Sequence, residues 1–310
     1  HNALTQRAWY YSTLTIDPVN ADVVWIPQVA LLRTIDGGRS IHSVGGIHHG
    51  DVHDLWIDPR APERVIIGND GGVDLSLDGG KTWFAPPMPW SQFYNVDVDD
   101  RLPYHVGGTV QDEGTAMGPS DSLRAEGIVL GDWQTAGGGE AGDFVFDRAE
   151  EGVVYAGEYG GIMTRWEEGS ANERNISYYP TNPSGHGSED LRVRFQWTAP
   201  LLASRREPGV IFHGSNILLR SADGGQTWKQ VSPDLTRNDK EKQKWSGGPI
   251  TGDNTGVEIY DTIFSLAEST HAAGELWAGT DDGLVHMTRD GGASWANVTP
   301  AGMPEWATVE

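Results

Sequence analysis

The chain of 310 residues contains no cysteine. It can therefore form no disulfide and can hold no metal through thiolate ligands. It also lacks any run of about 18 apolar residues, the length that a membrane-spanning helix requires. We therefore expect a protein that does not span a membrane, and the composition gives no reason to expect a cofactor.

Basic residues are scarce, with Lys and Arg numbering 22 against 44 Asp and Glu, so that the formal net charge is −22. Such a chain repels polyanions, which excludes nucleic acid and anionic membrane surfaces as expected partners. Neutral polar ligands such as glycans, or cations, suit it better. Its 41 glycines, 17 prolines and 13 tryptophans favour short strands and tight turns over helices.

One eight-residue pattern recurs along the chain. It reads SLDGGKTW at 76–83, SADGGQTW at 221–228 and TRDGGASW at 288–295, with a weaker copy, TIDGGRSI, at 34–41. The pattern predicts a strand, a tight turn and a second strand, because the Asp side chain accepts backbone N–H bonds and the glycines supply positive φ. We expect the Trp to lie back over the hairpin and bury its ring against the sheet.

The spacing of these turns indicates larger repeats. Asp36 and Asp78 are 42 residues apart, and the 145 residues between Asp78 and Asp223 fit three units of about 48. Alternating apolar residues within each unit suggest four strands, which is typical of a β-propeller blade. The fold class expected is therefore an all-β propeller of four-stranded antiparallel blades. Six blades are predicted, at 10–46, 51–87, 92–136, 141–180, 194–235 and 257–300.

These blades are expected to form a single propeller domain over residues 1–310. A propeller must close, because open sheet edges promote aggregation. Six blades could close alone, or a seventh could come from outside this sequence, since residues 304–306 read as the start of another blade.

The repeated pattern resembles the Asp-box, or BNR repeat, of sialidases, family 74 xyloglucan hydrolases and sortilin-type receptors. Longer strings resemble large bacterial exported proteins described as glycosyl-hydrolase-like or sortilin-like BNR-repeat proteins. These strings are HGDVHDLWIDP at 49–59, GNDGG at 68–72, RFQW at 194–197 and SPDLTRND at 232–239.

The resemblance implies a chain that is secreted, periplasmic or on the cell surface. Members of that family usually carry two propellers, so a second propeller of the same protein is an expected partner. The chain begins at His1 without Met or an apolar leader, so we expect either that a leader has been removed or that the sequence is part of a longer protein.

Blade geometry indicates where a site should lie. The predicted Asp-boxes are third–fourth turns and share one face of the disc, so a site is expected on the other, where second–third turns and inter-blade connections meet. Carboxylates beside flat aromatic rings are what a sugar-binding surface needs, although acidic loops are also ordinary in an acidic protein. The ligand-binding candidates are Asp51, His53, Asp70, Tyr94, Asp112, Trp133, Tyr159, Arg194, Trp197 and Asp281.

Two glutamates are the catalytic candidates. Glu140 and Glu258 each precede an innermost strand, which places them near the mouth of the central channel. A glycosidase needs two carboxylates about 5–5.5 Å apart for retention or about 6.5–9.5 Å apart for inversion. We expect these two within about 10 Å of each other in an open cleft. The alternative is that each glutamate caps a blade junction by accepting backbone N–H bonds.

The family resemblance bears on this pair. In family 74 enzymes the two catalytic acids lie across a cleft between two propellers, and only one propeller is visible here. A sialidase would need an arginine triad, and Arg194 is the one well-placed arginine.

The pattern His49-x-Asp51-x-His53 could hold a metal ion only if the chain turned at Gly50, because residues 49 and 53 lie roughly 13 Å apart along a strand. We predict no metal there and expect hydrogen bonds that fix the start of the second blade.

Two functions remain open. The first is a carbohydrate-active propeller, glycoside hydrolase-like or glycan-binding. The second is a non-catalytic propeller that presents the same face to a protein ligand, as a sortilin-like or scaffold module.

Overall fold

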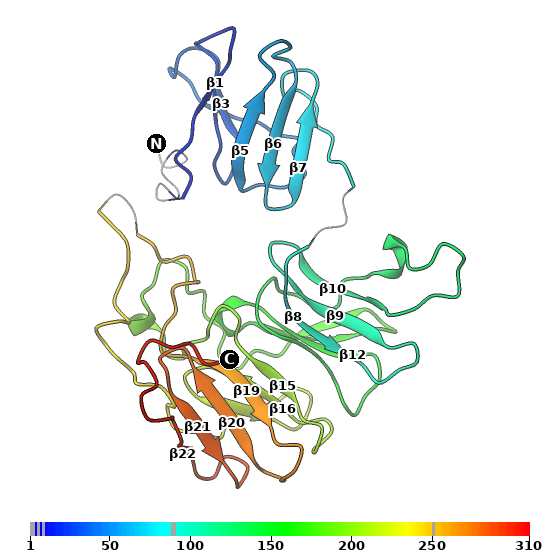
Figure 1. Cartoon of the computed structure of the whole chain (residues 1–310), viewed down its shortest axis with the longest axis vertical. Coiled ribbons are helices and arrows are strands. Elements are labelled where there is room, and N and C mark those ends of the chain that lie inside the picture. The colour runs from blue at the N-terminus through cyan, green and yellow to red at the C-terminus, as the bar shows by residue number, and fades with distance from the viewer. Residues whose placement is uncertain (1–3, 5–6, 8–9, 88–90, 250–251) are drawn as a thin grey trace. The chain divides into compact units, whose positions relative to one another are not determined.

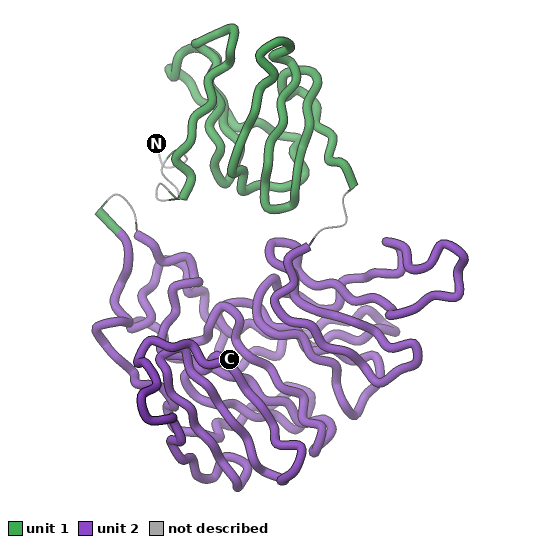
Figure 2. Tube along the Cα trace, viewed as in Figure 1, with its two compact units in different colours: residues 1–90, 248–251 green, residues 91–247, 252–310 purple. Residues whose placement is uncertain are grey.

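The computed structural model describes residues 4, 7, 10–87, 91–249 and 252–310. In this part of the chain there is no α-helix, and short antiparallel strands make up the regular structure (Figure 1). Contacts divide the chain into two compact units. Unit 1 comprises residues 1–90 and 248–251, and unit 2 comprises residues 91–247 and 252–310 (Figure 2).

Unit 1 holds two antiparallel sheets that share one apolar core. Trp25 and Leu31 of the first sheet pack with Leu55 and Ile67 of the second. The third strand of the second sheet is bridged by Phe84, which stands in the fourth-strand position. The sheets comprise β1 (Thr15–Ile16), β2 (Val24–Ile26), β3 (Leu32–Thr34) and β4 (His42–Ser43), then β5 (Val52–Ile57), β6 (Val65–Asn69) and β7 (Gly72–Ser76).

Unit 2 holds four antiparallel sheets whose strands follow chain order. The first is β8 (Phe93–Val98), β9 (His105–Val110) and β10 (Gly114–Pro119), with Gln134 bridging Met117 in the fourth position. The second is β11 (Phe144–Phe146), β12 (Val153–Gly157), β13 (Met163–Glu167) and β14 (Asn172–Asn175). The third is β15 (Leu201–Ala203), β16 (Ile211–Gly214), β17 (Leu218–Ser221) and β18 (Lys229–Gln230). The fourth is β19 (Ile263–Glu268), β20 (Leu276–Thr280), β21 (Val285–Thr288) and β22 (Ala296–Asn297).

The first strands of the four sheets in unit 2 contact one another in succession, β8 with β11, β11 with β15 and β15 with β19. Sheets that follow one another along the chain and meet through their first strands are the blades of a β-propeller. The predicted fold class, an all-β propeller of antiparallel blades with six blades visible, is confirmed. The prediction of one domain over residues 1–310 stays a prediction.

The turns of all four copies of the eight-residue pattern connect the third strand of a sheet to the fourth position, as predicted. In the turn at 221–228, Asp223 Oδ1 accepts the Thr227 N–H at 2.9 Å and Oδ2 accepts its hydroxyl at 2.6 Å. Gly224 and Gly225 have φ of 66° and 80°. These donors hold the pKa of Asp223 at about 2.

The tryptophan that ends each full pattern packs against its own blade, as the sequence predicted, and also reaches the preceding blade. Trp228 Nε1 donates to the carbonyl oxygen of Ile176 at 2.7 Å, and Trp295 Nε1 donates to that of Val231 at 2.9 Å. Trp83 meets Trp25 edge to face, with ring centroids 6.4 Å apart. The turn itself packs closely on the preceding blade, because a Cβ at Gly225 would lie only 2.5 Å from Cδ1 of Ile176. This close packing brings the tryptophan within reach of that blade.

This contact predicts a measurable cost for losing the indole. We expect Trp228→Phe to lower the free energy of unfolding by about 1 kcal/mol, because the Ile176 carbonyl loses its donor. Trp228→Ala should cost about 3 kcal/mol, since the ring is also lost. The measurement is denaturant unfolding. The control is Trp277→Phe, whose indole is 38 % exposed and bonds Glu275 in the same blade. Equal effects at positions 228 and 277 would contradict the inter-blade role.

The turns also predict acid sensitivity. The pKa values of Asp36, Asp223 and Asp290 are lowered to about 2, so the stabilisation that these groups provide is complete above the ordinary pKa near 4 and is lost as the pH falls through about 2. We expect Asp223→Asn to flatten the dependence of stability on pH between about 4 and 2. Asp100→Asn, which removes a 77 % exposed carboxylate, should not. Thermal melts across this pH range make the comparison.

Candidate functional site

Three aromatic side chains of unit 2 lie together. The rings of Tyr159 and Trp197 are parallel, with centroids 4.8 Å apart and an angle of 1° between their planes. Trp197 Nε1 donates to the Tyr94 hydroxyl at 3.0 Å, and that hydroxyl donates in turn to Gln111. Tyr94 lies on β8, Tyr159 follows β12, and Trp197 precedes β15, so three successive blades contribute.

Two glycines explain how the chain brings these rings together. Gly160 and Gly161, which follow Tyr159, have φ of 70° and 76°. A Cβ on Gly160 would lie 2.3 Å from the Thr181 carbonyl oxygen, and one on Gly161 would lie 2.3 Å from the Phe195 ring. Because both residues lack a side chain, the turn packs directly on Phe195, two residues before Trp197. Trp197 then lies against Tyr159.

Carboxylates surround these rings. Glu140 Oε2 accepts the backbone N–H of Asp112 at 3.0 Å, and the two carboxyl groups are also hydrogen-bonded to each other. Gln111 Nε2 donates to Asp112 Oδ1 at 2.6 Å. Burial raises the pKa of Glu140 to about 7, helped by the bond to Asp112 and by the charges of Asp112 and Glu158. Glu140 is therefore partly protonated near neutral pH.

We call this group the acid–aromatic cluster. Of the predicted residues, the structure brings Glu140, Tyr94, Asp112, Tyr159 and Trp197 together in it. Gln111 and Glu158 belong to it but were not among the candidates, although they stand next to Asp112 and Tyr159 in the same second–third turns. Its members are Tyr94, Gln111, Asp112, Glu140, Glu158, Tyr159 and Trp197.

Glu258 caps a turn. Its carboxylate accepts the Thr255 N–H at 2.7 Å and the Thr255 hydroxyl at 3.0 Å. Within the described residues no hydrogen bond or ion pair joins it to Glu140, and the predicted separation of the two stays a prediction. The same segment borders the cluster, since a Cβ at Gly256 would lie 3.8 Å from Cδ2 of Tyr159.

Arg194 and Asp281 are buried, at 5 % exposure each, and do not face a ligand surface. Arg194 donates to the side chain of Asp234 and to the Asp261 carbonyl oxygen. Asp281 accepts the N–H and the hydroxyl of Thr262. Both residues were predicted to bind ligand, and the structure instead places them inside the junction between the last two blades.

Trp133 lies at the other end of its blade. Gln134 forms a β-bridge with Met117, so Trp133 lies beside Gly118. A Cβ at Gly118 would lie 2.6 Å from the Trp133 ring. Gly118 lies near the end of β10, towards the third–fourth turn, whereas Asp112 lies before its start. Trp133 was expected on the same face of the propeller as Asp112, and the structure places the two towards opposite ends of the blade.

Asp51, His53 and Asp70 belong to unit 1. His53 Nε2 and Asp70 Oδ1 are paired, and Asp51 accepts a bond from the Tyr11 hydroxyl. Asp51 has φ of 51°, so the chain does turn beside Gly50. Among the described residues, no group of three or more His, Asp or Glu side chains is arranged to hold a metal ion.

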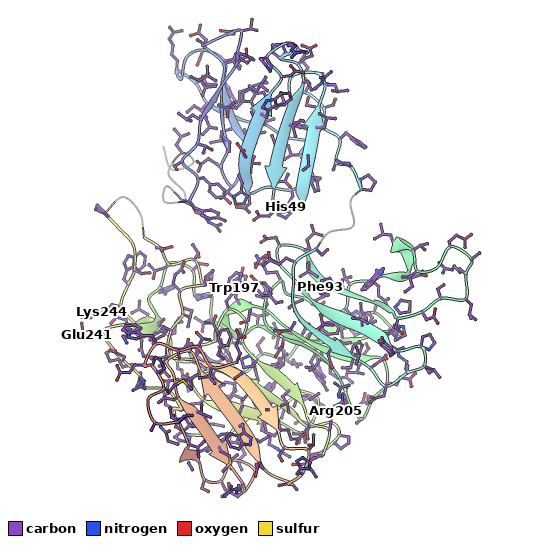
Figure 3. The ribbon with its side chains drawn as sticks, in the orientation of Figure 1. His49, Phe93, Trp197, Arg205, Glu241 and Lys244 are labelled. Carbon is purple, nitrogen blue, oxygen red and sulfur yellow. The ribbon has the colours of Figure 1, made fainter. Side chains whose placement is uncertain are left out.

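Figure 3 labels Trp197 and, towards the opposite end of the sheets, Arg205 in the first–second turn after β15.

No helix among the described residues is long and apolar enough to cross a membrane.

No family model matches the chain, and no curated protein matches it. Solved structures similar to it include YCF48 bound to a D1 peptide, at 14 % identity and a TM-score of 0.37, covering 93 % of this chain and 80 % of that one. An ancestral GH74 enzyme has 15 % identity and a TM-score of 0.33, covering 96 % of this chain. The GH74 xyloglucanase from Xanthomonas campestris has 16 % identity and a TM-score of 0.29, covering 90 % of this chain.

This chain spans 32 % and 36 % of those two GH74 enzymes, about a third of their length. The fold class rests on the sheets, and the function must be argued from the site.

The cluster predicts an unusual titration. Glu140 should titrate near pH 7, and Asp112→Asn should lower that midpoint because it removes a neighbouring negative charge. The raised pKa also means that stability falls as the pH rises from about 4.5 through 7. Glu140→Gln should therefore stabilise the fold above pH 7, on the order of 1 kcal/mol after solvent screening of this half-exposed group.

Carbon-detected NMR of the carboxyl groups measures the midpoint, with Glu140→Gln identifying the resonance. A midpoint near the ordinary glutamate value would show that the carboxyl pair is absent in solution.

Proposed function

We propose that this chain is a carbohydrate-active β-propeller that binds a glycan at the acid–aromatic cluster. The observation that carries the proposal is the parallel Tyr159–Trp197 pair next to the hydrogen-bonded Glu140–Asp112 pair. Aromatic rings cover the apolar face of a pyranose, and carboxylates take its hydroxyls. A neutral ligand also suits a chain with a net charge of −22.

Glu140 has a chemical role in this proposal. Because its pKa is about 7, much of it is protonated at neutral pH, and the group can donate a hydrogen bond or a proton to a ligand oxygen. The carboxyl groups of Asp112 and Glu140 are hydrogen-bonded to each other. This separation is shorter than the distance of about 5 Å or more between the two catalytic carboxylates of a glycosidase. Hydrolysis would need a carboxylate at a greater distance from Glu140 than Asp112, and the one proposed from the sequence is Glu258. Binding is therefore the central claim.

Three further proposals follow from the sequence. The Asp-Gly-Gly turns support the Asp-box resemblance, since each Asp is held by the serine or threonine side chains of its own pattern. With that resemblance we propose an exported chain, secreted, periplasmic or on the cell surface. We also propose that it forms one propeller and belongs to a longer protein whose second propeller completes the site.

The test is binding of purified protein to a glycan array, followed by calorimetry with each glycan that binds. Trp197→Ala and Tyr159→Ala should each weaken binding by about tenfold or more, because each removes a ring of the stacked pair. Trp133→Ala is the matched control, since it removes a 37 % exposed tryptophan from the other end of the blade. It should leave the affinity within about twofold.

Two outcomes would overturn the proposal. One is the absence of any bound glycan. The other is binding that Trp133→Ala weakens as much as Trp197→Ala does. Capture of a protein ligand by the same cluster, with no glycan bound, would favour the interaction propeller instead. A hydrolysis screen with Glu140→Gln and Glu258→Gln then separates binding from catalysis.

A further inference from the structure

A lysine of unit 2 lies over two aromatic rings far from the acid–aromatic cluster in sequence. Lys242 Nζ is 2.9 Å from the ring centroid of Trp306 and 5.8 Å from that of Tyr260. The two rings are themselves stacked, with centroids 6.4 Å apart and planes 28° apart. An ammonium group over aromatic faces at this range is held by a cation–π interaction.

The surroundings of the rings are negative. Burial raises the pKa of Tyr260 to about 12, and the charges of Asp282, Asp281 and Asp261 add to the effect. The Tyr260 hydroxyl is buried and finds no hydrogen-bond partner among the described residues. Aromatic faces in a field of carboxylates favour a cation over a neutral or anionic group.

The loop that carries Lys242 is fixed by other residues. Gln243 is buried, and its side-chain amide donates to Asp261 Oδ2 at 2.5 Å and to Asn238 Oδ1 at 2.9 Å. The Lys242 side chain makes one ion pair, to Asp239 at 3.6 Å. Figure 3 labels its neighbours Glu241 and Lys244 on this loop. The Lys242 side chain can therefore swing away while the backbone stays in place.

We propose that the Tyr260–Trp306 ring pair is a binding site for an alkylammonium group, and that Lys242 occupies it as a competitor supplied by the chain itself. Trp306 is 66 % exposed, so the rings can be reached from solvent. The ligand chemistry is a primary or quaternary ammonium on an aliphatic stem. It could come from a free small amine or from a lysine side chain of a peptide.

The experiment titrates choline into wild type, Lys242→Ala and Lys244→Ala, following the indole resonances by NMR. Lys242→Ala should bind choline about tenfold more tightly than wild type, because a tethered competitor at high effective concentration has been removed. Lys244→Ala is the matched control, since it takes the same charge from a side chain that pairs with Glu241. Its affinity should equal that of wild type. The neutral isostere 3,3-dimethyl-1-butanol should not bind any of the three.

A second arm replaces choline with Nα-acetyl-lysine methylamide. If Lys242→Ala binds this probe more tightly than it binds choline, the ligand is a peptide lysine. If it binds choline more tightly than this probe, the ligand is a small quaternary amine. Trp306→Ala added to Lys242→Ala should abolish both. The proposal is overturned if Lys242→Ala binds no more tightly than wild type, or if binding survives the loss of Trp306.

Thermal melting shows whether Lys242→Ala folds. If it does not, titrating wild type with choline to saturation gives the answer, because displacement of Lys242 must shift the Trp306 indole resonance. No shift there would equally overturn the proposal. The result is independent of glycan binding, since these variants alter no ring and no carboxyl group of the acid–aromatic cluster.

Discussion

Tryptophan side chains that reach from one blade to the next are the contact on which the rest of this structure depends. Trp228 bonds the backbone of Ile176, so the third blade of unit 2 is fixed to the second at the end where the Asp-Gly-Gly turns lie. The acid–aromatic cluster stands at the other end and takes Tyr94, Tyr159 and Trp197 from three successive blades. The stacking of Tyr159 on Trp197, which joins the second and third blades, therefore depends on the junction that Trp228 fixes.

A buried histidine lies against Phe195, close to the cluster. His213 on β16 is buried, stacks on Phe195 at 4.8 Å, and has both ring nitrogens without a partner among the described residues. Burial lowers its pKa to about 3, so it stays neutral over the pH range in which Glu140 titrates. His213 therefore keeps the same charge while Glu140 titrates. Phe195, two residues before Trp197, therefore stays stacked on a neutral His213 over the pH range in which Glu140 titrates.

The sequence predicted well what local chemistry decides. The eight-residue pattern makes the same turn in all four copies, because its Asp accepts the hydroxyl of the Ser or Thr four residues on. The pattern therefore located the blades, and with them the end at which Asp112 and Tyr159 lie. It failed where the partner is remote. Arg194 can be buried because the Asp234 side chain and the Asp261 carbonyl oxygen accept its hydrogen bonds. Neither acceptor is close to Arg194 in the sequence, so the residues around Arg194 do not reveal its burial. Trp133 was misplaced because its blade has lost the pattern that fixes strand phase.

Crowding of like charges links the two proposed sites. In a chain of net charge −22, neighbouring carboxylates cannot all ionise, and protons are held where the chain folds them together. Burial, followed by the neighbouring Asp112, raises the pKa of Glu140, and burial, followed by the neighbouring Asp282, raises that of Asp261. A protonated carboxyl suits the hydroxyls of a neutral ligand, whereas the ring faces of Tyr260 and Trp306 hold a cation. The same excess of acid thus favours a sugar beside Glu140 and an ammonium group beside Tyr260, where Lys242 already stands.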